Sequence, residues 1–185
     1  MALNILLLSF LASYPILSSV VAADSDFTLY AYGTDINGLE LFFADGNAQV
    51  GDISTAATSN VSNVYFTLDR GELLANPNLT STRTFRPSFN STWSNLELNV
   101  PVDDDSSNSI SFTQNFISNE TGKWRFYGPS LLFDTSSGQL ISLFFAKPAA
   151  TTGLFDLVWD LSKAEQEENP DAKPVALRNI APTSG

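Results

Sequence analysis

The residues that could do chemistry in this chain are mainly carboxylates, because the sequence contains no histidine and no cysteine. Their absence excludes Ser-His-Asp and Cys-His catalysis, ordinary zinc sites and redox-active thiols. Two routes remain: a pair of carboxylates that acts on a sugar, and a cofactor-free pocket that only positions and polarises its ligand. The candidates for such a pair are Asp45, Asp52, Asp69, Glu72, Glu97, Asp134, Asp156 and Asp160.

The positions of these carboxylates disfavour a glycosidase. Asp45 and Asp69 fall in predicted turns, where aspartate is favoured for backbone reasons. Glu97 alternates with Leu96 and Leu98, so we expect its side chain to face solvent. The pattern therefore fits a non-enzymatic protein better than a hydrolase.

No motif in the sequence indicates a cofactor or a metal ion. The chain has no phosphate-binding glycine loop and no dinucleotide fingerprint. The run Asp103-Asp104-Asp105 resembles the start of a calcium loop, but Asn108 stands where glycine is needed and Gln114 where glutamate is needed. We therefore expect neither a cofactor nor a metal site.

The candidate ligand-binding residues are two tyrosines and two arginines. Tyr30 and Tyr32 share one face of a predicted strand, where they could stack on a sugar ring or line a pocket for an apolar ligand. Packing beneath a second layer is the alternative for both rings. Arg83 and Arg86 could hold a carboxylate or an enolate, and the alternative for them is pairing with neighbouring acidic residues.

The elements that must position these residues are short strands. Runs with period-two alternation, separated by turn signals, predict an all-β domain: an antiparallel sandwich or barrel of about ten short strands. Asp45-Gly46 is the strongest hairpin signal. The only plausible helical turn is 161–168. The predicted strands are 27–32, 39–44, 47–50, 63–68, 72–75, 93–100, 110–112, 123–127, 130–133, 139–146 and 153–161, with a short one at 83–86.

Breaks between strands are predicted from glycine, proline and polar clusters. Residues 33–38 read as a turn, and Pro77 predicts a loop at 75–78 because proline cannot donate to a strand ladder. Residues 162–185 read as a polar, acidic C-terminal segment.

The N-terminus predicts export. Residues 1–23 combine an apolar core that is too short to span a bilayer with small residues before Asp24, as in a signal peptide. Residues 24–185 would then form one secreted domain that does not enter a membrane. Its net charge of −11 argues against nucleic acid and anionic lipid surfaces as partners. Without cysteine, its stability must come from packing and backbone pairing.

Four sequons predict N-glycosylation in the secretory pathway. Their acceptor residues are Asn60, Asn78, Asn90 and Asn119, and all four fall in predicted loops or at strand ends. Glycan at these positions would keep the surrounding loops out of a tight protein interface.

Several runs along the chain resemble the small secreted proteins that are widespread in filamentous fungi. The resemblance rests on 27–33 (FTLYAYG), 37–39 (NGL), 43–46 (FADG), Gly51-Asp52 and 174–178 (PVALR). These are turn and strand signatures, so the resemblance implies a fungal origin and an extracellular location and brings no activity or site residue.

Three functions follow as hypotheses. The first is a non-enzymatic, secreted glycoprotein that is extracellular or associated with the cell wall, with a wall polysaccharide or another extracellular ligand as partner. The alternative is a lipocalin-like, cofactor-free barrel that binds an apolar metabolite and templates a cyclisation. The third, an effector directed at a host, differs from the first only in its partner.

Overall fold

The computed structural model describes residues 26–78, 93–101, 108–114 and 123–183. The predicted export segment 1–23, the predicted short strand 83–86, and the acceptors Asn90 and Asn119 lie outside the described residues. Arg83 and Arg86 lie outside them as well.

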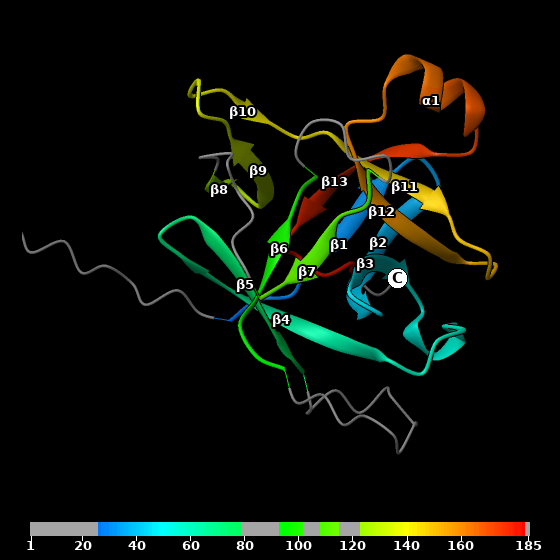
Figure 1. Ribbon diagram of the computed structural model, residues 1–185, viewed down its shortest axis with the longest axis horizontal. Coiled ribbons are helices and arrows are strands. Elements are labelled where there is room, and N and C mark those ends of the chain that lie inside the picture. The colour runs from blue at the N-terminus through cyan, green and yellow to red at the C-terminus, as the bar shows by residue number, and fades with distance from the viewer. Residues whose placement is uncertain (1–25, 79–92, 102–107, 115–122, 184–185) are drawn as a thin grey trace, which may run out of the picture.

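Within the described part, the chain is almost entirely β-structure (Figure 1). It adds one short 3₁₀ helix, η1 (Ile53–Thr55), and one short α-helix, α1 (Lys163–Glu168). The strands are β1 (Tyr30–Gly33), β2 (Ile36–Ala44), β3 (Asn47–Gly51), β4 (Val61–Asp69), β5 (Glu72–Pro77), β6 (Leu96–Asn99), β7 (Ser111–Thr113), β8 (Lys123–Tyr127), β9 (Ser130–Asp134), β10 (Leu140–Ile141), β11 (Phe144–Pro148), β12 (Leu154–Trp159) and β13 (Lys173–Arg178).

Ten of the described strands form a closed antiparallel barrel in the order β1-β2-β4-β5-β6-β7-β3-β12-β11-β13. Pairing of β13 with β1, in the register Ala31 with Leu177, closes the ring. Strands β8, β9 and β10 extend the sheet beyond β13. The predicted fold class, an all-β antiparallel single domain, is confirmed, and of its two forms the structure is the barrel.

The hairpin between β2 and β3 turns at the residues that the sequence predicted. Asp45 and Gly46 have φ of 48° and 88°, as a two-residue type I′ turn requires. Ala44 and Asn47 pair directly before and after them. This turn fixes the register of both strands, because a two-residue loop allows no slippage.

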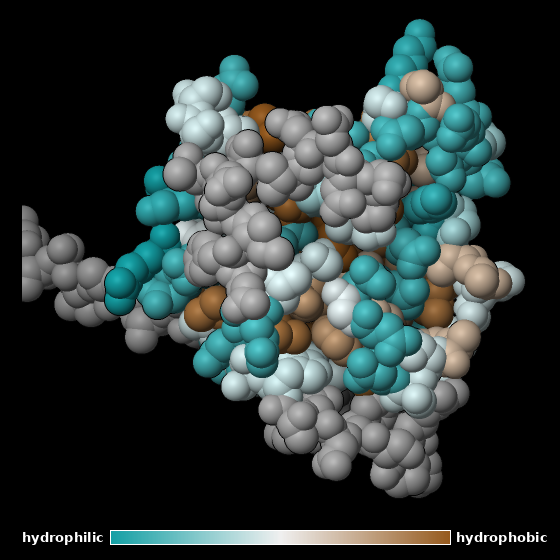
Figure 2. Space-filling model, in the orientation of Figure 1, coloured by the Kyte–Doolittle hydropathy of each residue, from teal (hydrophilic) through white to brown (hydrophobic). Residues whose placement is uncertain are grey.

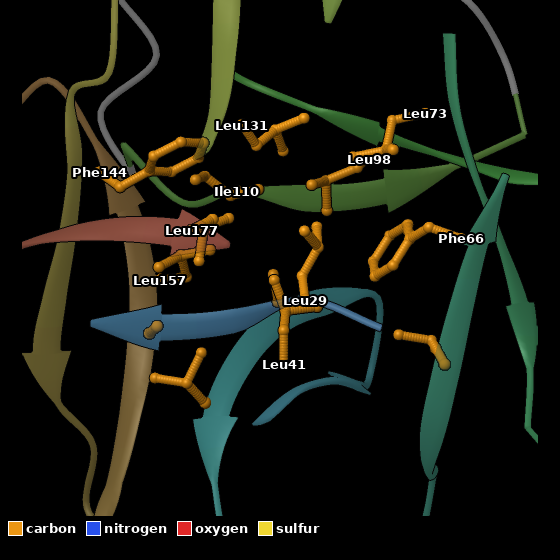
Figure 3. Packing of buried hydrophobic residues seen from close by; sticks show 14 of the residues in the cluster. Leu29, Leu41, Phe66, Leu73, Leu98, Ile110, Leu131, Phe144, Leu157 and Leu177 are labelled. Carbon is orange, nitrogen blue, oxygen red and sulfur yellow. The ribbon is translucent and has the colours of Figure 1, made fainter. Parts of the chain in front are cut away.

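The interior of the barrel is filled by apolar side chains that converge from strands around the ring (Figure 3). Leu29, Leu98 and Leu177 have no exposed surface, and burial of each contributes about 1.5–3 kcal/mol. The hairpin of β8 and β9 adds Trp124 and Leu131 to the same core. One connected core therefore serves both the ring and its extension.

The structure corrects the predicted loop at 75–78, because β5 continues to Pro77, which pairs with Val64 of β4. The hydrogen bond beside this pair runs from the Asn78 amide to the Asn63 carbonyl at 2.7 Å. The nitrogen of Pro77 therefore points away from β4, and its missing N–H leaves this ladder intact.

Three further boundaries differ from the prediction. The turn after β1 is shorter than 33–38, since β2 begins at Ile36. The predicted strand 139–146 is two strands, because β10 pairs with β9 whereas β11 pairs with β12 and β13. The segment assigned to a polar C-terminus contains β13, in which Val175 and Leu177 alternate into the core.

The predicted helical turn forms as α1 and begins with a capping box between Ser162 and Glu165. The Ser162 amide donates to a Glu165 carboxylate oxygen at 2.7 Å, and the Asn108 side chain donates to the other at 2.7 Å. Hydrogen bonding with the Ser162 side chain and backbone, and then with Asn108, lowers the pKa of Glu165. The helix has no buried residue and shows a hydrophilic surface at the upper right of Figure 2.

Candidate functional site

A groove of about 960 Å³ crosses the outer face of the barrel. Its lining residues come from β1, β2, β3 and β4, from η1 and the residue before it, and from the C-terminal segment, with Thr28 just before β1 and Asn78 just after β5. The described residues that line it are Thr28, Tyr30, Gly38, Leu39, Glu40, Phe42, Gly51, Asp52, Ile53, Ser54, Asn63, Asn78, Ala181 and Pro182. The groove lies on the outside of the ring, so a ligand can reach it without entering the barrel.

The alternation of side chains along β1 explains why two tyrosines lie on its outer face. Ala31 is fully buried in the core, so its neighbours Tyr30 and Tyr32 both project from the outer face of β1 and are half-buried. Tyr30 lies directly opposite Glu40 of β2. The prediction that the two tyrosines share one face is confirmed, and Tyr30 lines the groove.

Polar residues line the same groove as Tyr30. Glu40 and Asp52 bring carboxylates, while Asn63 and Asn78 bring amides that both donate and accept hydrogen bonds. Asp52 also accepts a hydrogen bond from the Ser54 amide at 3.0 Å, which holds the first turn of η1 against the groove. A groove lined by an aromatic ring, carboxylates and amides can bind a molecule that has both apolar faces and hydroxyl groups.

Tyr32 lines a neighbouring pocket of about 370 Å³, together with Asn37, Arg178 and the residues 180–183. The guanidinium carbon of Arg178 lies 5.2 Å from the centre of the Tyr32 ring, within the range of a cation–π contact. The Tyr32 hydroxyl donates to the Ile180 carbonyl at 2.8 Å. Tyr30 and Tyr32 therefore occupy different hollows, although they share a face.

The structure brings two of the candidate carboxylates, Glu72 and Glu97, near each other, but neither of them lines the groove. Only Asp52 lines the groove; Asp134 pairs with Arg125 at 2.6 Å, and Asp156 accepts from Gln49 at 2.7 Å. Within the described ranges, no group of three or more acidic residues is arranged to hold a metal ion.

Sequence reasoning missed Glu40 and Asn63 as groove residues. A signal for Glu40 was present, because it alternates with Leu39 and Leu41 and so faces outward beside Tyr30. Asn63 is only 5% exposed, and nothing in the sequence around it indicates that it lines a groove.

Glu97 lies on the outer face of β6, as expected, but its side chain is only partly exposed to solvent. Its Oε2 atom is buried and, among the described residues, has no hydrogen-bond partner. Burial raises the pKa of Glu97, and the nearby carboxylate of Glu72 raises it further. The alternation was correct, because Leu96 and Leu98 are buried on one face of β6 and Glu97 lies on the other, but that other face is only partly exposed.

We predict that Glu97→Gln stabilises the protein at neutral pH. The folded state holds the proton of Glu97 more tightly than the unfolded state, so ionisation costs stability as the pH rises from the ordinary pKa through the raised one. Because this side chain is partly solvated, we expect a rise in Tm of only about 1–3 °C at pH 7. The gain should disappear below pH of about 4, as measured by thermal unfolding across pH. A gain that is equal at both pH values would contradict the titration of Glu97 as its cause.

Two predicted glycan acceptors lie in described regions. Asn60 is exposed beside the turn between β2 and β3, where its carbonyl accepts from the Asp45 amide at 2.9 Å. Asn78 is half-buried at the groove. Their glycosylation stays a prediction.

The described residues include no helix with the length and apolar character needed to cross a bilayer. The chain matches no protein-family model, and no curated protein or solved structure is significantly similar to it. Function must therefore be argued from the groove itself.

Proposed function

We propose that this chain is a secreted, N-glycosylated, non-enzymatic protein that binds a polysaccharide of the cell wall through the groove at Tyr30. The observation that carries the proposal is the outward-facing Tyr30 ring, opposite Glu40 on the neighbouring strand and in a groove with Asp52 and Asn63. Sugar rings have apolar faces that stack on aromatic side chains and hydroxyl groups that hydrogen-bond to carboxylates and amides.

The charge of the protein narrows the class of polysaccharide. A net charge of −11, together with two carboxylates at the groove, repels polyanions. A neutral wall polymer meets no such penalty. The proposed ligand is therefore a neutral polysaccharide, and the export segment and sequons support an extracellular encounter with it.

The alternative of a lipocalin-like barrel for an apolar metabolite has less support. Ligands of that class enter the barrel, whereas the described residues fill this interior with side chains such as Leu41, Phe66 and Leu157. The aromatic cluster of Trp124, Phe144 and Trp159 packs there with ring centres 4.9–6.2 Å apart. A ligand on the outer face fits this packing better.

The test is a pull-down of the purified protein on insoluble neutral polysaccharides, namely β-glucan, chitin and mannan, with Tyr30→Ala as the main variant. We expect retention on at least one polymer and a loss of affinity of about tenfold or more in the variant, because the stacking surface is removed. Tyr127→Ala is the matched control, since Tyr127 is 76% exposed on β8 and does not line the groove.

Retention on none of the polymers would contradict the proposal. So would an equal loss in both variants, because binding would then not depend on the groove. Preferential binding to host surfaces instead of wall polymers would favour the effector hypothesis.

A further inference from the structure

We propose that the Tyr30 groove and the Tyr32 pocket are two parts of one glycan-binding face, and that residues 180–183 form a displaceable strap which divides them. The proposal rests on the proposed function and specifies its ligand: a long oligosaccharide uses both parts, and a short one uses only the groove. The tail then limits the length of chain that the protein binds tightly.

The two hollows adjoin at the tail. Ala181 and Pro182 line both the Tyr30 groove and the Tyr32 pocket. The tyrosines behind them are two positions apart on the same face of β1, which corresponds to about 7 Å along an extended strand. A chain of sugars lying along this face would cross the position that Ala181 and Pro182 now occupy.

Specific contacts hold the tail in this position. The Tyr32 hydroxyl donates to the Ile180 carbonyl at 2.8 Å. Pro182 lies so close to Gly38 that a Cβ atom added there would be 2.7–3.0 Å from three atoms of the proline ring. Because Gly38 has no side chain, the ring can rest directly on the β2 backbone, and the strap reaches its position without a strand pairing.

The same tail is weakly held elsewhere. Residues 179–183 are all exposed, and none of them belongs to a strand or a helix. Ile180 leaves 55% of its surface in solvent although it is a large apolar residue. Displacing this segment breaks few contacts, so a ligand that gains contacts on both sides of it can move it.

The Tyr32 pocket offers hydrogen-bond donors to a ligand. Arg178 rests over the Tyr32 ring, which orients its guanidinium group. No carboxylate of the described residues forms an ion pair with Arg178, so its charge is not neutralised by the residues seen around it. Arg178 and the Asn37 amide can therefore donate to sugar hydroxyls at the far end of a long ligand.

Tyr32 has two roles: its ring lies beneath Arg178, and its hydroxyl holds the tail at Ile180. The variant Tyr32→Phe separates them. The variant keeps the ring beneath Arg178 and removes the hydroxyl that holds Ile180, so the tail is released while the pocket stays intact. We expect a neutral hexasaccharide of the polymer that the protein retains to bind about three- to tenfold more tightly to this variant. The disaccharide of the same polymer, which uses only the Tyr30 groove, should show no such gain. A purely structural role for the hydroxyl would predict no gain for either ligand.

A chain that ends at Asn179 provides a second variant, and isothermal titration calorimetry measures both. This chain should also gain affinity for the hexasaccharide, whereas adding Arg178→Gln to Tyr32→Phe should cancel the gain. Thermal unfolding of each variant verifies that the barrel is folded.

The outcomes separate the two proposals. If the hexasaccharide binds in a Tyr30-dependent way but neither variant binds it more tightly, the proposed strap is contradicted. The proposed binding at the Tyr30 groove is then still supported. If neither the unmodified protein nor any variant binds either ligand, both the proposed binding at the groove and the proposed strap are contradicted.

Discussion

Trp124→Ala is expected to lower the free energy of unfolding by about 3–5 kcal/mol, a large share of the stability of an ordinary domain. Trp124 is 3% exposed and contacts the rings of Phe133, Phe144 and Trp159 at centroid distances of 5.1–6.2 Å. Alanine would leave a cavity at the point where the β8–β9 hairpin joins the barrel core. Urea unfolding measures the loss, and Trp159 remains as a fluorescent probe.

Trp124→Phe is the matched variant for this prediction. It keeps an aromatic ring in the core but removes the indole N–H that donates to the Leu98 carbonyl at 3.1 Å. Leaving that buried carbonyl without its donor should cost about 1–3 kcal/mol, less than the cavity. Equal losses in the two variants would show that the hydrogen bond, and not ring packing, accounts for the role of Trp124.

The second large effect is expected at the seam where the barrel closes. Gly33 of β1 pairs with Val175 of β13, and an added Cβ atom would lie 2.6 Å from the Pro174 carbonyl oxygen and 3.0 Å from a Val175 methyl group. The first of these atoms belongs to the backbone, so only a shift of the strand relieves the clash. We expect Gly33→Ala to cost about 3 kcal/mol or more.

Hydrogen exchange locates this loss. The amides of β1 and β13 should exchange faster in Gly33→Ala, while those of the β4–β5 pair keep their protection at low denaturant. Gly46→Ala is the control, because a Cβ atom there meets nothing within 4 Å and the cost is limited to the positive φ of 88°, about 1 kcal/mol. A uniform rise in exchange over the whole barrel would contradict opening at the seam.

Local signals predicted most of the strands, because each needs only alternation and a nearby turn. Asp45-Gly46 and its two strands are the clearest case, since all the information lies within 39–50. Strand β13 was missed because it contains Pro174, follows an acidic helix and has only two inward apolar residues, Val175 and Leu177. Its partner β1 lies far away in the sequence, and no local pattern indicates such a pairing.

In the candidate site, too, local features were predicted and features that join distant segments were not. The shared face of Tyr30 and Tyr32 follows from strand periodicity and was predicted. The groove was not, because its walls come from η1 and from Ala181 and Pro182, which are distant in the chain. Glu97 shows a second limit of sequence periodicity. Periodicity predicts the face of the strand on which a side chain lies, but the surrounding structure determines whether that face is exposed to solvent.

The pairing of β1 with β13 also determines when folding can finish. The ring joins Tyr30 to Arg178, so the barrel cannot close before residue 178 has been synthesised and released. Until then β1 presents an open strand edge, the kind of surface that pairs with other chains. A chain that stops short of β13 would therefore have an unpaired strand edge and a strong tendency to aggregate.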